Sequence, residues 1–402
     1  MKLSTKKLPA VPGFTAAGIA CGIKDGTLLD LALIVSEVPA KAAGVFTLNR
    51  VRSPSVTWCE KALKKTREVK AVLINSGNAN ACVGPQGYAD CKNIASTLAK
   101  ELSVSPQEIL IASTGIIGVP LPAEKITSAI GRITKKHSAK NWNKAADAIL
   151  TTDLVRKTAV LETQLSGKTI VIGGITKGSG MIHPNMATLL GFIQTNANVE
   201  SDTLQKALKE ATDRSFNCIT VDGDMSTNDC VILLANGVAG NPLIRYGTKA
   251  YEQFVAALTE LSISLAKQIV QDGEGATKFV TVRVEGAKSR KQAHTIANSV
   301  ATSSLVKTAL FGEDPNWGRI LAAVGYAGVP IKPDQITIAL NGGVLFQNGS
   351  PSKAANQEIL RKKMQKKNIL LNVHLGEGEE WAELYTCDFS YDYVRINAEY
   401  TT

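Results

Sequence analysis

The sequence predicts a layered protein of mixed helices and strands, of the α+β class, with two or three lobes. Short apolar runs, which favour strands, alternate with longer amphipathic stretches, which favour helices. The chain has 402 residues, which is too long for one ordinary core. Aromatic residues make up only 5% of the chain. We therefore expect a core built mainly from Ala, Val, Ile and Leu.

Strands are predicted where a short apolar run is bounded by polar or turn-forming residues. In chain order these runs are Ala71–Ile74, Thr169–Ile175, Val231–Leu234, Phe279–Val284, Ile336–Leu340 and Ile369–Leu375. After Phe279–Val284 the chain becomes polar and basic near Gly286–Lys288. We expect a boundary there between a core portion and a smaller C-terminal lobe.

Helices are predicted between these strands, where apolar residues recur every three or four positions. The predicted helices are Cys91–Leu102, Lys140–Leu150, Ser201–Ser215, Thr248–Val270, Asn298–Leu310 and Lys353–Lys367. The clearest pattern belongs to Thr248–Val270, in which Phe254, Leu258, Leu261 and Leu265 fall on one face.

The formal net charge of +10 is compatible with two kinds of partner. A basic protein binds nucleic acid through its phosphates, or attracts small acidic substrates by its field. The basic run Arg361–Lys367 has no interleaved aromatic residues, which a base-stacking surface needs. We therefore read the run as a solvated helix face and expect no nucleic-acid partner.

The seven cysteines are scattered, and none forms a CxxC pair. This pattern argues for reduced thiols in a cytoplasmic protein, and against a zinc site or a disulfide framework. The N-terminal residues lack the apolar core of a signal peptide, and no stretch approaches the roughly 18 apolar residues of a membrane span. We expect a cytoplasmic protein without a membrane partner.

Several motifs favour ordinary structural roles when they are read alone. Asp272–Lys278 is rich in glycine but lacks the spacing of a P-loop. Asp222–Asp229 has the alternating acids of a calcium loop, yet Thr227 and Leu233 stand where glycine and glutamate are needed. It reads as a polar turn whose short side chains bond to the local backbone. The histidines show no metal-ligand spacing, and for His183 a structural role is favoured, so no metal is expected.

One segment carries a resemblance to a known family. Thr176–Phe192 reads TKGSGMIHPNMATLLGF. Taken alone, Thr188 is one threonine among many at the head of a strand. The segment nevertheless strongly resembles the self-cleavage segment of ornithine acetyltransferases. The resemblance extends along the whole chain through Gly13–Ile19, Asn75–Cys82, Ser113–Gly118, Asp222–Asp229, Asp272–Lys278, Asp314–Arg319 and Ile396–Tyr400, in family order.

The resemblance implies a fold and a way of maturing. The fold is the layered sheet-and-helix core of self-cleaving N-terminal-nucleophile proteins, with a smaller C-terminal α/β lobe. The chain would cut itself between Ala187 and Thr188 into residues 1–187 and 188–402. The second fragment would hold a core portion to about residue 285 and a lobe over residues 286–402. Two copies of each fragment would form a heterotetramer.

The resemblance also assigns roles to residues. Thr188 would be the nucleophile, and Thr114 and Gly115 would donate a hydroxyl and a backbone N–H to the oxyanion. Substrate contacts would come from Thr152, Lys177, Thr188, Glu274, Asn397 and Thr402. A freed α-amine has a reference pKa of about 7.7–8.0 and can take the proton of the adjacent Thr188 hydroxyl. Judged singly, Lys177 could instead be a surface charge and Thr152 a helix cap.

The implied activity is acetyl transfer from N2-acetylornithine to glutamate through an acetyl-Thr188 intermediate. No bound cofactor is expected; acetyl-CoA is favoured as a second acetyl donor, although no residue decides this. One alternative is an N-terminal-threonine amidase or aminopeptidase that releases the acyl group to water. Another is a basic binding protein without catalysis, which would remain one intact polypeptide.

Overall fold

The computed structural model describes residues 1–183, 189–353 and 356–399. It divides into two compact units, which we treat separately. The first comprises Met1–Asn217 and Asp224–Ile269, and the second comprises Cys218–Gly223 and the chain from Val270. The expected lobe boundary near residue 286 therefore falls inside a strand of the second unit, β10 (Phe279–Ala287). The division into fragments at residues 187 and 188 stays a prediction.

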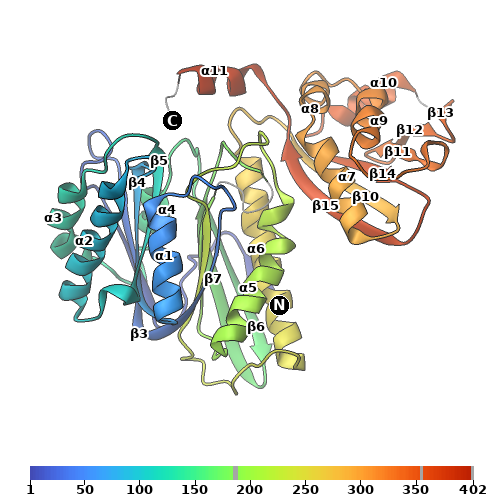
Figure 1. Cartoon of the computed structure of the whole chain (residues 1–402). Coiled ribbons are helices and arrows are strands. Elements are labelled where there is room, and N and C mark those ends of the chain that lie inside the picture. The colour runs from blue at the N-terminus through green and yellow to red at the C-terminus, as the bar shows by residue number, and fades with distance from the viewer. Residues whose placement is uncertain (184–188, 354–355, 400–402) are drawn as a thin grey trace. The chain divides into compact units, whose positions relative to one another are not determined.

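A mixed nine-stranded sheet is the centre of the first unit (Figure 1). Its path is β1 (Lys2–Ser4), β6 (Lys157–Leu165), β7 (Lys168–Lys177), β8 (Leu190–Thr195), β9 (Cys230–Ala235), β3 (Leu31–Phe46), β4 (Glu68–Asn78) and β5 (Ile109–Ile116), with β2 (Phe14–Ile19) paired to β3. The long strand β3 joins the part of the sheet that runs from β1 to β9 to the part that contains β2, β4 and β5. Its first half pairs with β2 and β4, and its second half pairs with β9. The pairs β8–β9 and β4–β5 are parallel.

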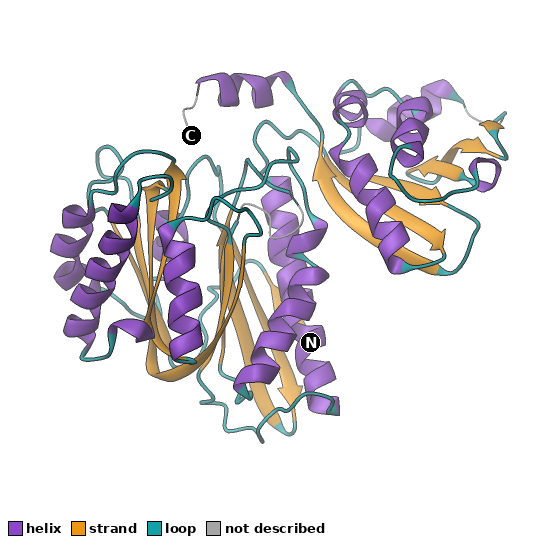
Figure 2. Cartoon of the chain, viewed as in Figure 1, coloured by secondary structure: helices purple, strands orange, loops and turns teal. Residues whose placement is uncertain are grey.

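Helices flank this sheet (Figure 2). They are α1 (Pro54–Lys65), α2 (Pro85–Leu102), α3 (Ala123–Thr134), α4 (Trp142–Ala148), α5 (Ser201–Asp213) and α6 (Lys249–Gln271), which ends in the second unit. Helix α1 packs on β3 and β5, α4 on β2 and β3, and α5 on β3 and β9. The core is dominated by Ala, Val, Ile and Leu, as the low aromatic content predicted.

The second unit is a smaller sheet with its own helices. The strand order is β13 (Ser350–Pro351), β12 (Gly343–Gln347), β11 (Thr337–Leu340), β14 (Asn368–His374), β10 and β15 (Glu380–Cys387). The helices are α7 (Arg290–Thr302), α8 (Ser304–Phe311), α9 (Trp317–Gly325), α10 (Gln357–Met364) and α11 (Tyr391–Glu399). Helix α7 packs on β10 and β15 and buries a separate aliphatic core.

The layered α+β prediction is confirmed, and each predicted strand overlaps an observed one. One predicted helix is wrong. Asn298–Leu310 is not continuous, because the chain leaves the helical conformation at Ser303 (φ −67°, ψ 112°). The Ser303 hydroxyl accepts a hydrogen bond from the Val306 N–H at 3.3 Å and so begins α8. The basic helix predicted over residues 353–367 is also shorter, since α10 covers only Gln357–Met364.

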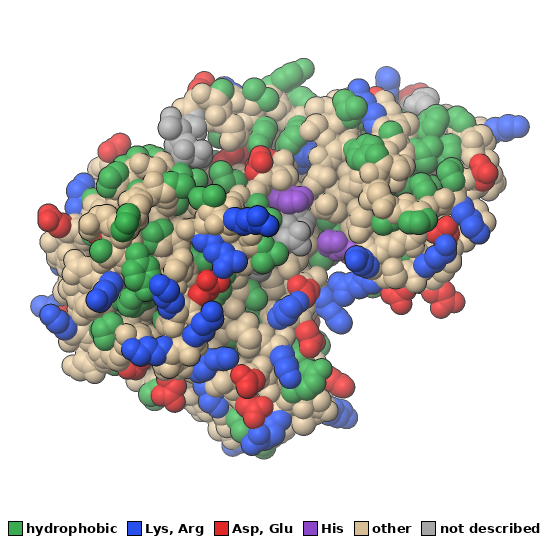
Figure 3. All heavy atoms as spheres, in the orientation of Figure 1, with side chains coloured by type: hydrophobic (Ala, Val, Ile, Leu, Met, Phe, Trp, Pro, Cys, Tyr) green, Lys and Arg blue, Asp and Glu red, His purple; other side chains and the backbone are tan. Residues whose placement is uncertain are grey.

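Two general features of the described residues bear on partners. None of the described helices is long and apolar enough to cross a membrane. In the first unit, Lys and Arg side chains on the visible face are scattered among acidic and apolar side chains, without a continuous stripe (Figure 3).

β2 and α4 pack so closely at Gly18 that adding a single methyl group there tests the contact. A Cβ added at Gly18 would lie 2.0 Å from the backbone oxygen of Lys144. Gly18→Ala must therefore displace α4, and we expect it to lower the free energy of unfolding by about 1–3 kcal/mol. Gly131, inside α3, is the matched control, because a Cβ there meets nothing within 4 Å. Gly131→Ala should stabilise by about 0.5–1 kcal/mol. Equal effects in urea titrations would contradict this packing.

Candidate active site

The structure brings two pairs of the predicted site residues together. Thr114 and Lys177 are brought together in the first unit. Glu274 and Asn397 are brought together in the second unit. The cleavage residues Ala187 and Thr188 and the chain end Thr402 lie outside the described residues, so their roles stay predictions.

Lys177 is a buried cation, and this argues against reading it as a surface charge. It ends β7, and its side chain is 6% exposed. Its Nζ donates to the hydroxyl of Thr151 at 2.7 Å and lies 3.4 Å from the hydroxyl of Thr114. Lys177 pairs across the sheet with Leu190, two residues beyond Thr188 in the chain. Lys177 therefore joins the end of β5, the turn after α4 and the β7–β8 pair.

Asp153 supplies the counter-charge, and sequence reasoning missed it. Its side chain is fully buried. Oδ1 accepts from Lys157 Nζ at 2.6 Å and from the Gly178 N–H at 2.8 Å. Oδ2 accepts from the Thr151 N–H at 3.1 Å and lies 3.8 Å from Lys177 Nζ. Burial alone would raise the pKa of Asp153, but the charges of Lys177 and Lys157 and these hydrogen bonds hold that pKa well below its usual range.

A third lysine, which is partly buried, adds positive charge near Lys177. Lys24 Nζ donates to the backbone oxygens of Leu29 and Leu150 at 3.1 and 2.6 Å. Burial lowers the pKa of Lys24, Asp30 opposes this, and the Lys177 charge adds to the lowering. Among these described groups, the lysines (Lys24, Lys157 and Lys177) outnumber the aspartates that face them (Asp30 and Asp153) by one. Such a site favours an anionic group.

The end of β5 approaches the end of β4 so closely that only glycine fits. Gly115 has φ +130°, and a Cβ there would lie 2.3 Å from the backbone carbon of Gly77. Next to it, Thr114 is 9% exposed, and its hydroxyl oxygen accepts from Lys177. Because that oxygen serves as the acceptor, the Thr114 O–H proton remains to be donated elsewhere. The O–H of Thr114 and the backbone N–H of Gly115 therefore suit a pair of donors to an oxyanion.

In the second unit, Glu274 is held between a loop and the last described helix. Its side chain is 7% exposed, and Oε2 accepts from Asn397 Nδ2 on α11 at 2.9 Å. Gly275 (φ +66°) permits this approach, because a Cβ there would lie 2.4 Å from the Tyr393 nitrogen. The Ser390 hydroxyl also donates to the Gly275 carbonyl at 2.6 Å. The bond from Asn397 uses only one oxygen of the Glu274 carboxylate. A buried carboxylate of this kind suits a cationic group.

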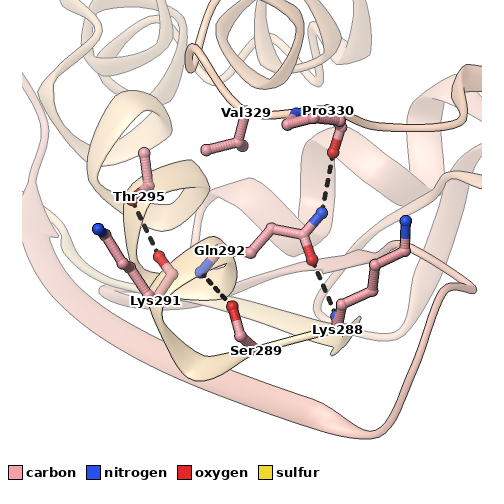
Figure 4. A pocket seen from close by; sticks show the side chains of 7 residues that line it. All are labelled: Lys288, Ser289, Lys291, Gln292, Thr295, Val329 and Pro330. Carbon is pink, nitrogen blue, oxygen red and sulfur yellow. Dashed lines mark hydrogen bonds between the residues drawn. The ribbon is translucent and has the colours of Figure 1, made fainter.

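Two other features do not form a competing site. No group of three or more His, Cys, Asp or Glu side chains that could hold a metal ion occurs within residues 1–183, 189–353 and 356–399. A hollow in the second unit is lined by Lys288, Ser289, Lys291, Gln292, Thr295, Val329 and Pro330 (Figure 4). There the Gln292 amide is already bonded to the Lys288 N–H and the Pro330 carbonyl. Of the predicted substrate residues that the structure describes, none lines this hollow.

The buried cluster makes a prediction about stability and pH. Asp153→Asn leaves Lys157 and Lys177 without their counter-charge, so the free energy of unfolding should fall by about 3–5 kcal/mol at pH 7. Because the native pKa of Asp153 is depressed, its stabilisation is present above the unfolded-state pKa of about 3.9 and is lost below it. The difference between wild type and variant should therefore be constant from about pH 5 to 7 and shrink in acid.

Asp213→Asn is the control for this prediction. Asp213 also pairs with a lysine at 2.6 Å, but both side chains of that pair are exposed. We expect a loss below about 1 kcal/mol there. Urea titrations at several pH values measure both variants. Equal losses for the two, or a loss for Asp153→Asn that does not change in acid, would contradict the cluster's described role.

Comparisons with known proteins match the chain over nearly its whole length. The ArgJ family model matches residues 15–402. The chain is 46% identical over 406 residues to "Arginine biosynthesis bifunctional protein ArgJ 1" of Nostoc, covering 99% of this chain and 98% of the relative. It is also 46% identical over 398 residues to the ArgJ bifunctional protein of Symbiobacterium thermophilum, covering 98% of each.

Among solved structures, the ArgJ bifunctional protein of Bacillus halodurans matches with 40% identity and a TM-score of 0.49. That match covers 51% of this chain and 96% of the solved chain. The family match and the identity to relatives extend over nearly the full length of the chain, and the chain therefore belongs to the ArgJ family.

Proposed function

We propose that the chain is an acetyltransferase of arginine biosynthesis that moves an acetyl group from N2-acetylornithine to glutamate. The observation that carries this proposal is the family match across residues 15–402, with relatives of 46% identity that are named arginine biosynthesis bifunctional proteins. The buried Lys177–Thr114 contact adds support, because it joins an anion-binding charge to an oxyanion donor.

The enzyme first has to make its own nucleophile. The Thr188 hydroxyl attacks the carbonyl carbon of Ala187, the C–N bond breaks, and the nitrogen leaves as the Thr188 amine. Water then hydrolyses the resulting ester, which frees the hydroxyl and leaves a carboxylate on Ala187. The new amine stands on the same residue as the hydroxyl, with a reference pKa of about 7.7–8.0. It can therefore serve as the general base without a histidine.

Acetyl transfer then takes two half-reactions. The Thr188 oxygen attacks the acetyl carbonyl of N2-acetylornithine, and ornithine leaves with the proton that the amine had taken. The amine of glutamate next attacks the acetyl-Thr188 ester and restores the hydroxyl. Both steps pass through an oxyanion, for which the Thr114 O–H and the Gly115 N–H are the proposed donors. Loss of one such donor typically costs about 2.7–4 kcal/mol of barrier.

Charged groups in each of the two units suit the two substrates. Both carry an α-carboxylate, which the excess positive charge near Lys177 would attract. The buried carboxylate of Glu274 would receive the side-chain ammonium of ornithine. Thr152, Asn397 and Thr402 complete the proposed set of substrate contacts.

Four further features belong to the same proposal. Acetyl-CoA is a second acetyl donor to glutamate, the enzyme carries no bound cofactor, the two fragments assemble as two copies of each, and the reaction takes place in the cytoplasm. The scattered cysteines support the last of these, because a reducing compartment keeps thiols free.

The nucleophile can be tested by the state of the backbone. Purified wild type should give two fragments by intact mass, the second with Thr188 at its N-terminus. Thr188→Ala should remain one inactive chain, because the attacking hydroxyl is absent, while Thr188→Ser should still be cut. Thr169→Ala, which changes an exposed threonine on β7, is the control and should be cut normally. An uncut wild type that turns over at full rate would exclude this nucleophile.

The acceptor distinguishes the transferase from a hydrolase. With N2-acetylornithine alone, wild type should release at most one equivalent of ornithine per active site, because the acetyl group stays on Thr188. Added glutamate should restore turnover and give N-acetylglutamate, measured by mass spectrometry. Sustained acetate release at a rate that glutamate does not change would favour the amidase-type alternative.

A further inference from the structure

The polar turn that leads into β9 is buried. Ser226, Thr227, Asn228 and Asp229 are each between 1% and 8% exposed. The sequence predicted a turn whose side chains bond to the local backbone, and one such bond runs from the Asn228 N–H to the Ser226 hydroxyl. The structure adds contacts to segments that are far away in the sequence. These contacts come from Asn228 and Asp229.

Asn228 fastens the ends of two parallel strands. Its Nδ2 donates to the carbonyl of Ala79, just after β4, at 2.6 Å, and to the carbonyl of Ser113, on β5, at 2.8 Å. Its Oδ1 accepts from the Thr227 hydroxyl at 2.6 Å. Both N–H groups of the amide are therefore used. The Ser113 carbonyl belongs to the same peptide plane as the Thr114 nitrogen, so the amide of Asn228 fixes the plane that precedes the proposed oxyanion donors.

Asp229 fastens the start of β8. Its Oδ1 accepts from the Leu189 N–H at 3.1 Å. The next residue, the first of β9, holds the peptide on the other side of Leu189, since the Cys230 N–H donates to the Leu189 carbonyl at 3.1 Å. The backbone oxygen of Asp229 accepts from the Thr47 N–H at 3.0 Å. Leu189 nitrogen is bonded covalently to the carbonyl carbon of Thr188.

The side chain of Asp229 is enclosed by its surroundings. It is 1% exposed, and its Oδ2 makes no hydrogen bond within the described part of the chain. Burial raises the pKa of Asp229 well above its usual range, against the opposing effects of the Leu189 N–H, the Lys177 charge and the Ser226 hydroxyl. The Leu189 N–H requires an acceptor oxygen at this position, and Oδ1 provides it.

We propose that Asn228 and Asp229 form a positioning element that sets the distance between the oxyanion donors of Thr114 and Gly115 and the backbone that carries Thr188. The inference rests on the proposed function. Two adjacent side chains at one strand end hold the two segments that must cooperate, the end of β5 and the start of β8. Because a displacement of about 1 Å at a reacting centre can cost about 100-fold in rate, loss of either fastening should reduce kcat.

The first test compares two buried asparagines in the full-length protein. Asn228→Ala should lower kcat for acetyl transfer about 100-fold per cleaved chain, with little change in KM, because the substrate contacts remain. It should also slow self-cleavage, followed by intact mass, since cleavage uses the same donors. The fraction of cut chains is measured in each preparation, so that kcat refers only to mature enzyme.

Asn241→Ala is the matched control. Asn241 is 4% exposed, against 5% for Asn228, and is likewise bonded to backbone groups, through Asn198 and Pro242. It holds a loop that contains none of the proposed site residues. The two variants should lose similar free energies of unfolding, while Asn241→Ala keeps the wild-type kcat. If kcat falls equally in both variants, the positioning role is overturned.

A second pair of variants decides the question if Asn228→Ala does not fold. Asp229→Ala removes the acceptor for Leu189 and should lower kcat, whereas Asp229→Asn supplies an oxygen at the same place and should restore most of it. A fully cut Asp229→Asn enzyme as slow as Asp229→Ala would overturn the role assigned to the acceptor. A wild type without acetyl transfer would instead refute the proposed function, so the two failures are distinguishable.

Discussion

The buried ammonium group of Lys177 is the contact on which the rest of the first unit's site depends. It links the end of β5, the turn after α4 and the end of β7 through Thr114, Thr151 and Asp153. Two unit charges about 4 Å apart attract by about 4 kcal/mol at an effective dielectric constant of 20, and burying each ion costs several kcal/mol. The two terms are comparable. The cluster therefore adds little net stability, and its main effect is to hold a positive charge in place.

Because the ion pairs add little net stability, the geometry of the site depends on short polar contacts that the sheet supports. Thr114 and Gly115 stand where β4 and β5 come so close that a Cβ does not fit. The side-chain amide of Asn228 donates to one backbone carbonyl at each of the same two strand ends. A displaced strand would leave buried carbonyls without donors, at about 1–3 kcal/mol each. Loss of these hydrogen bonds would destabilise the fold and would also displace the proposed oxyanion donors. The stability of the fold and the geometry of the site are therefore coupled.

Much of the fold could be predicted from the sequence, because strand and helix periodicities depend on neighbouring residues. The helix predicted over Thr248–Val270 is observed as α6. The break at Ser303 was missed, because a serine cap inside an apolar pattern has no strong local signal. Lys177, Thr114 and Glu274 were named through a family resemblance, and their burial could not have been deduced from residue spacing. Asp153 and Asp229 were missed because several of their partners, among them Lys177, Gly178 and Leu189, lie 24 or more residues away.

The residues that sequence reasoning passed over share a physical property. Asp153 and Asp229 are both buried carboxyl groups, yet their surroundings push their pKa values in opposite directions. Two lysines lie beside Asp153, and their charges lower its pKa against the effect of burial. At Asp229 the effect of burial is larger than that of the Lys177 charge, so its pKa is raised. Asp153 thus provides a negative charge beside Lys177, and Asp229 provides a hydrogen-bond acceptor for Leu189. Both residues are aspartates in the sequence, and only their neighbours in the folded structure determine which role each one has.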